Sequence, residues 1–317
     1  MPFKTKRVSK TVKERYLRTL IKRIKREKFL YIMVLPTLIY FFIFHYIPMY
    51  GIVIAFQDYS PAGGFFRSPW VGFEHFRNFF SSPYFLRLLR NTFLLSFYSL
   101  IFGFPVPIVF ALLLNEVKNT VFKRTVQTVS YFPHFVSVVI IVGIMNIFLS
   151  PTDGLVNLLL QRFGYKPIYF MQEIRWFRFL YVSSGIWQHF GWSSIIYLAV
   201  LSGISPELYE AAIVDGASRF QRAIYISIPC LLPTIILLLI LNIGNLLNVG
   251  FEKIILMYSP RTYEVADVIS TYVYRRGLLE ANFSFGAAVG LFNNIVNFVL
   301  LLLANYVAKR VTEYSLW

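Results

Sequence analysis

The sequence predicts an all-α integral membrane protein with about six transmembrane helices. The chain of 317 residues is 57% hydrophobic and only 15% charged, whereas soluble domains carry about 25% charged residues. Its mean hydropathy is +0.59. Apolar runs of about 20 residues, the length of helix that crosses a bilayer core of about 30 Å, occur six times along the chain. Prolines lie in several of these runs, and membrane helices tolerate them when neighbouring groups satisfy the freed carbonyls.

These runs predict a tail of residues 1–28 followed by a transmembrane domain of residues 29–317. The six predicted spans lie near 29–54, 92–114, 129–149, 178–203, 231–250 and 285–307.

The tail sets the predicted orientation. It holds twelve of the 31 Lys and Arg residues, and such an excess predicts a cytoplasmic N-terminus. An even number of spans returns the C-terminus to the same side, which gives an N-in/C-in topology. Outside the tail the basic residues do not favour this orientation, so it depends on one segment.

Apolar residues recur every four positions within the tail, at Val12, Tyr16, Leu20 and Ile24. This pattern predicts a basic amphipathic helix on the anionic inner leaflet, and a solvated run of charge is the alternative. The net charge of +16 is explained by this tail and ordinary loop charges, so no nucleic-acid partner is predicted.

The segment between the fourth and fifth predicted spans reads ELYEAAIVDGASRFQRAIYISIP and is predicted to be cytoplasmic. Ser205 is a plausible N-cap, followed by Pro206 at the first helical position and acids in the first turns. Gly216 is expected to break this helix by taking a positive φ. A second short helix is predicted over 218–226, ending at Pro229. Two short helices with a sharp bend would form a rigid projection suited to docking into a soluble partner.

The spacing of Glu210-Ala211-Ala212, Gly216 and Ile228-Pro229 resembles the EAA loop of permease subunits in binding-protein-dependent ABC importers. That signature has Leu where this chain has Ile228. The stretches WVGFEHFRNFF and FKRTVQTVSYFPHFVSVVI resemble the carbohydrate-uptake branch of the family. FHYIPMYGIVIAFQDY and YEVADVISTYVYRRGL resemble its polysaccharide or oligosaccharide permeases.

The resemblance implies the type I ABC importer permease fold in a bacterial cytoplasmic (inner) membrane. The EAA loop, residues 205–229, would be a coupling helix held in a cleft of a cytoplasmic ABC ATPase dimer, with Glu210 pairing with a basic residue of the ATPase. The alternative is that Glu210 only stabilises its own helix dipole. The resemblance implies these ATPase-coupling residues: Glu210, Ala211, Ala212, Asp215, Gly216, Arg219 and Pro229.

The further partners implied are a second homologous permease subunit, giving a heterodimer, an extracytoplasmic solute-binding protein, and an oligosaccharide solute. The chain itself is not expected to be an enzyme. It contains no Gly-Lys dipeptide and so no phosphate-binding loop. ATP and magnesium would therefore bind the partner ATPase. The four His residues lack metal-ligand spacing and there is one Cys, so no metal site is predicted.

Polar residues near mid-bilayer depth are candidates for the solute pathway. Carboxamides donate and accept hydrogen bonds, and an indole offers an apolar platform to a sugar ring. Asn242, Asn245 and Asn248 step by three residues and are expected to share a helix face. The alternative is that such residues join helices, and in related importers the partner subunit can be the one that holds the solute. The candidates are Trp187, Gln188, Asn242, Asn245, Asn248, Asn293, Asn294 and Asn297.

Three other functions are alternatives to this one. An importer permease for another solute fits the same residues. A stand-alone secondary carrier would need intramembrane ionisable residues and internal repeats, and neither is evident. A membrane enzyme acting on lipid-linked sugars would need paired acids or a metal set, and the acids of the predicted external segments form no recognisable catalytic group.

Overall fold

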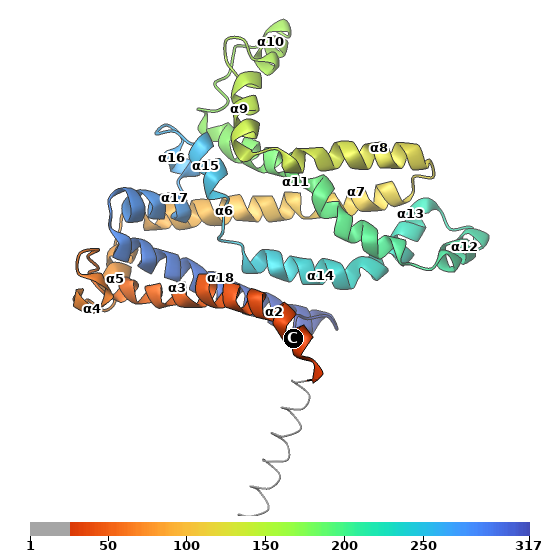
Figure 1. The fold of residues 1–317 in the computed structure, drawn as a ribbon. Helices are drawn as coiled ribbons and strands as arrows, with labels where there is room; N and C mark the ends of the chain where they lie inside the picture. The colour runs from red at the N-terminus through yellow and green to blue at the C-terminus, as the bar shows by residue number, and fades with distance from the viewer. Residues whose placement is uncertain (1–25) are drawn as a thin grey trace, which may run out of the picture. The chain divides into compact units, whose positions relative to one another are not determined.

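The computed structural model describes residues 26–317, and the regular elements of that part of the chain are helices (Figure 1). The chain divides into two compact units, one ending at Ile54 and the other comprising Ala55–Trp317. The amphipathic pattern predicted from Val12 to Ile24 lies outside the described residues.

From Lys28 on, the first unit is an apolar helical stretch that continues to Phe56. No side chain of its first helix is buried. A π-helical turn precedes Pro48, with the Ile47 N–H bonding to the carbonyl of Phe42. The parts of the stretch are α2 (Lys28–Phe41), η1 (Phe42–Tyr46), α3 (Ile47–Met49) and η2 (Tyr50–Phe56).

The second unit contains the remaining helices. In chain order they are α4 (Gly64–Arg67), α5 (Glu74–Phe80), α6 (Phe85–Gly103), α7 (Pro105–Asn115), α8 (Thr120–Tyr131), η3 (Phe132–Phe135), α9 (Val138–Phe148), α10 (Leu155–Arg162), α11 (Ile174–Ser202), α12 (Pro206–Val214), α13 (Arg219–Arg222), η4 (Ala223–Ser227), α14 (Ile228–Gly244), α15 (Phe251–Met257), α16 (Tyr263–Ala266), α17 (Ile269–Val273), η5 (Tyr274–Leu279) and α18 (Phe283–Val311).

Four helical stretches in the described chain are long and apolar enough to cross a membrane: Lys28–Phe56, Phe85–Asn115, Arg219–Gly244 and Phe283–Val311. A fifth is obtained if Thr120–Phe135 and Val138–Phe148 count as one bent span. These stretches and α11 together cover all six predicted runs, which are therefore largely helical. The number that cross the membrane and their orientation remain predictions.

Helix α11 has the length of a span, 29 residues, but is not among these apolar stretches. Side chains such as Gln188 and His189 lower its hydropathy. It packs against α6, α7, α8 and α14, with Phe177 and Tyr181 in one buried cluster and Tyr197 in another. Polar side chains of a membrane helix usually face the interior of the bundle, and Gln188 does so here, where it bonds to the carbonyl of Val136.

Two predicted spans have different shapes from those expected. The third bends by 99° between η3 and α9, where Pro133 interrupts the first helix and the Ser137 side chain caps the next one. The fifth was predicted to reach residue 250, but α14 ends at Gly244. Beyond that point the side chain of Asn297 accepts a hydrogen bond from the Leu247 N–H at 2.9 Å, which replaces a helical carbonyl.

The prediction that the second loop helix ends at Pro229 is wrong. The helix continues without interruption from Arg219 to Gly244. The π-helical turn η4 precedes Pro229, with the Ile228 N–H bonding to the carbonyl of Ala223. A proline lacks an N–H and its ring crowds the carbonyl four residues earlier. The wider turn shifts the bonding pattern ahead of the proline, as it does before Pro48 in the first unit.

Gly191 lets α11 and α8 approach at backbone distance. A Cβ atom built there would lie 2.1 Å from the carbonyl oxygen of Ser130. Such small-residue contacts are a common way for membrane helices to pack closely.

Substituting Gly191→Ala should force these two helices apart, at a cost of about 1–3 kcal/mol or more. We expect a fall of several degrees in the thermal unfolding midpoint of the purified protein. Gly103→Ala is the matched control, since its Cβ would meet only the Ile186 Cγ1 at 3.6 Å. Equal midpoints for the two variants would contradict this description of the contact.

Candidate functional site

The loop between α11 and α14 begins with α12, which has Ser205 at the N-cap position and Pro206 in the first turn. The Ser205 side chain makes no capping hydrogen bond. The helix ends at Val214, and the chain turns at Gly216, whose φ is +78°. The Gly216 N–H bonds to the carbonyl of Ile213 at 3.0 Å and the Ala217 N–H to that of Ala212 at 2.8 Å. This pair of bonds is the Schellman motif, and it fixes the bend in the loop.

The second half of the loop is also capped. Ser218 and Gln221 form a reciprocal capping box at the start of α13, which satisfies N–H groups that a helix start leaves free. From there the chain runs through η4 into α14, with Pro229 in the first turn of α14.

One contact joins the two halves of the loop, and another ties the loop to the helical bundle. The Tyr209 hydroxyl lies 2.9 Å from the Ser227 Oγ. The Arg222 guanidinium forms a 3.1 Å ion pair with Glu116, which follows α7. The side chains of this pair are largely shielded from solvent, so the pair is stronger than an exposed one. The loop is therefore joined to the end of α7 by an ion pair and to α14 by continuous helix.

The outer surface of the loop is both apolar and charged. Val214, Phe220 and Tyr225 are 87%, 73% and 75% exposed. Of the residues assigned to coupling, Ala212 is half-buried and the other six are exposed. Glu210 has no ion-pair partner within 4.0 Å among residues 26–317.

A cleft of about 1300 Å³ lies among α6, α7, α11, α14 and α15. Four of the predicted pathway residues line it: Gln188, Asn242, Asn245 and Asn248. Trp187 is half exposed and does not line it, whereas Trp192 does. Serine hydroxyls and aromatic rings complete the wall, which includes Ser96, Ser99, Ser193, Tyr181 and His189.

Asn248 is the centre of an asparagine network between the end of α14 and α18. Its Oδ1 accepts hydrogen bonds from Asn293 at 3.0 Å and Asn297 at 3.1 Å, and its Nδ2 lies 3.3 Å from the Asn245 Oδ1. Asn294 instead lines a second cavity of about 560 Å³, together with Asn248 and Asn293. Because α14 ends at Gly244, Asn242, Asn245 and Asn248 do not share a helix face as expected, although all three reach the cleft.

Gln188 is buried, and its Nε2 donates to the carbonyl of Val136 at 3.1 Å, at the bend between η3 and α9. Near it, the rings of His134 and Trp192 stack in parallel with centroids 4.7 Å apart, and the Nδ1 atoms of His134 and His189 are 3.2 Å apart. His189 and Trp192 are three positions apart on one helix and so share a face, which is the sequence signal that could have predicted this aromatic wall.

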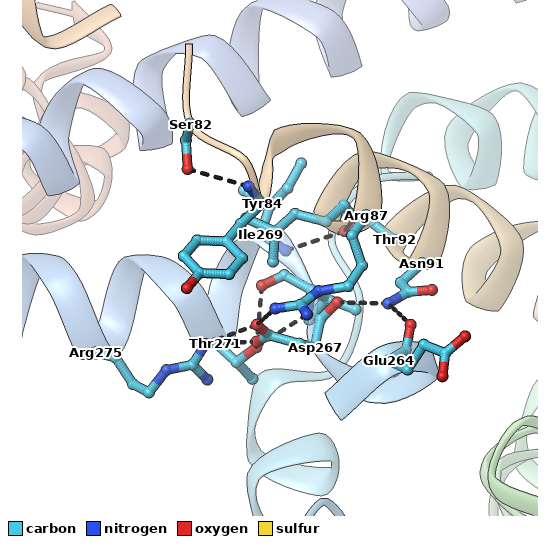
Figure 2. Close-up of polar contacts among 12 residues, drawn as sticks. Ser82, Tyr84, Arg87, Asn91, Thr92, Glu264, Asp267, Ile269, Thr271 and Arg275 are labelled. Carbon is cyan, nitrogen blue, oxygen red and sulfur yellow. Dashed lines mark hydrogen bonds and ion pairs between the residues drawn. The ribbon is translucent and has the colours of Figure 1, made fainter. Parts of the chain in front are cut away.

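A buried charge cluster was not predicted from the sequence. Figure 2 shows Asp267, which is 1% exposed, between Arg275 and Arg87. Arg275 reaches both carboxylate oxygens at 2.8 and 2.7 Å, and Arg87 lies at 3.5 Å. The Nδ2 of Asn91 donates to the carbonyls of Glu264 and Asp267. These residues are separated by up to 188 positions in the sequence, and no local pattern joins them.

In the described part of the chain, no group of three His, Cys, Asp or Glu side chains is arranged to hold a metal ion.

Comparisons with known proteins place this arrangement among transport proteins. The family described as "Binding-protein-dependent transport system inner membrane component" matches residues 103–313. Protein LplB of Bacillus subtilis (strain 168) is 47% identical over 93% of this chain and 92% of its own length.

The polygalacturonan/rhamnogalacturonan transport system permease protein YteP of the same organism is also 47% identical, over 96% of this chain and 95% of its own. A solved bacterial ABC transporter, described as involved in the import of the acidic polysaccharide alginate, contains a chain that is 48% identical. That chain superposes with a TM-score of 0.86 over 93% of this chain and 99% of its own.

The cluster around Asp267 can be tested through stability. Asp267→Asn keeps the size of the side chain but leaves two guanidinium groups without a counter-ion, which should cost about 3–5 kcal/mol. We expect a clear fall in the thermal unfolding midpoint of the purified protein. Glu280→Gln is the control, because it removes an ion pair with Arg276 that is about half exposed and contributes at most about 1 kcal/mol. A larger loss in the control would contradict the assignment.

Proposed function

Since the chain belongs to the family of binding-protein-dependent transport system inner membrane components, we propose that it is the permease subunit of an ATP-driven importer of oligosaccharides. Similar proteins are transport permeases for saccharides, so the chain is a multi-pass transporter subunit of the inner membrane and not an enzyme. Family membership also favours the importer over a stand-alone carrier.

The observation that best supports this function is the loop between α11 and α14. The end of α12 and the start of α13, which form its bend, are both capped. The Tyr209–Ser227 contact joins its two halves, the Arg222–Glu116 pair ties it to the end of α7, and its outer side carries exposed apolar groups. Monomeric proteins rarely leave such a surface uncovered unless it binds a partner. We assign that partner as the ATPase, which would hold ATP and magnesium, with the residues named above for coupling making the contact.

The cleft is the proposed solute pathway. Amides, hydroxyls and the Trp192 ring line it together, and these groups suit the hydroxyls and the C–H faces of a sugar. The pathway would be completed by a second permease subunit and supplied by an extracytoplasmic solute-binding protein. In this arrangement the tail and the loop would both face the cytoplasm.

Glu210→Lys tests the coupling role. The reversed charge should repel a basic residue of the ATPase and reduce solute-stimulated ATP hydrolysis by at least about tenfold, while the complex still assembles. The measurement is ATP turnover in proteoliposomes that contain the purified complex and binding protein. Glu313→Lys, an exposed acid near the C-terminus with the same charge change, is the control. Normal turnover in Glu210→Lys would refute the coupling role.

Asparagine variants separate the pathway from structure. Asn245→Ala removes an exposed amide that lines the cleft and should raise the half-saturating solute concentration about fivefold, with a smaller loss of stability than Asn297→Ala because its hydrogen bond to Asn248 is exposed. Asn297→Ala leaves the Leu247 N–H without its acceptor, which should cost about 1–3 kcal/mol of stability. Solute-stimulated ATP turnover and thermal unfolding are the two measurements. If neither variant changes the solute dependence, the pathway is misplaced.

A further inference from the structure

Lys253 on α15 is a buried cation in the wall of the cleft. Its side chain is 7% exposed, and its Nζ donates to the carbonyl oxygen of Tyr181 at 2.9 Å and lies 4.9 Å from the Tyr181 ring centroid. Gly185 makes room for it, since a Cβ there would approach the Nζ to 3.3 Å. The ammonium group therefore has a built position beside α11.

No acid neutralises this charge. Within residues 26–317, no carboxylate lies within 4.0 Å of the Lys253 Nζ, and the neighbouring Glu252 is exposed. Asp267, in contrast, is buried with two arginines. Lysines are rarely buried without a partner because the loss of hydration is costly. Burial lowers the pKa of Lys253, which lies outside the spanning stretches, to about 8. The ammonium form therefore still predominates at neutral pH.

The ammonium group has three N–H donors, and one is used by Tyr181. Two donors of Lys253 remain, and Lys253 lines the cleft together with Asn245, Asn248 and Glu252. Apart from the exposed Glu252, the other lining groups are amides, hydroxyls, rings and apolar side chains that suit a neutral sugar, and the buried cation suits an anionic substituent.

We propose that Lys253 selects oligosaccharides that carry carboxylates, such as uronic acid oligomers, by pairing with a sugar carboxylate in the cleft. This inference rests on the proposed function of the cleft as a solute pathway. One similar structure is described as importing the acidic polysaccharide alginate, which agrees with the chemistry of this side chain.

The test is direct binding to the purified permease–ATPase complex without the binding protein, so that selection by that protein does not contribute. The probes are trimers of galacturonic acid and of mannuronic acid, each compared with its carboxyl-reduced, neutral counterpart. Lys253→Gln should weaken binding of the preferred acidic trimer at least about tenfold and that of its neutral counterpart less than about twofold. Lys253→Arg keeps the charge and should retain most of the preference.

Lys166→Gln, the same change at an exposed lysine outside the cleft, should bind as the wild type does. The thermal midpoint and copurification of the ATPase report whether each variant has folded. The proposal is wrong if Lys253→Gln weakens acidic and neutral trimers equally or changes neither. It is also wrong if the wild type shows no preference for an acidic trimer, or if glucose 6-phosphate competes for the site and the uronates do not. If no ATPase copurifies with the wild type, the proposed function itself fails.

Discussion

Where a helix ends inside a membrane protein, the backbone N–H and C=O groups that follow must find new hydrogen-bond partners, and this requirement organises the second unit. Every buried carboxamide side chain in the described residues bonds main-chain groups. Asn157 is the most complete case, because it donates to three carbonyls and accepts from the Ile168 N–H. The others are Gln57, Asn91, Gln188, Asn297 and Asn305.

Burial therefore separates two uses of the same side chain. Asn297 is 5% exposed and holds the chain where α14 has ended. Asn242 and Asn245 are exposed to the cleft and donate only to carbonyls of their own helix, four residues earlier. The buried carboxamide stabilises the bundle, whereas the exposed carboxamides keep hydrogen-bonding capacity for a solute. Sequence position alone does not distinguish them, because all three lie in apolar runs.

Local signals predicted much of the fold. Hydrophobic runs located all six long helical regions, and Gly216 marked the bend in the loop because its positive φ is a local requirement. Features that depend on distant residues could not be predicted. The helix through Pro229 continues because of a π-helical turn, and α14 stops where Asn297 replaces a carbonyl. Asp267 pairs with Arg275, eight positions away, and also with Arg87, which is 180 positions away.

The loop and the cleft are connected by rigid elements. Helix α11 carries Tyr181, Gln188 and Trp192 along the cleft and ends at Ser202, directly before α12. The chain then returns from the loop as one continuous helix from Arg219 to Gly244, which brings Asn242 to the opposite wall. The ion pair between Arg222 and Glu116 adds the end of α7, a third wall, to the same body. In the proposed coupling, the continuous helix into α14 and the ion pair to the end of α7 would carry a movement of the loop to these two walls of the cleft.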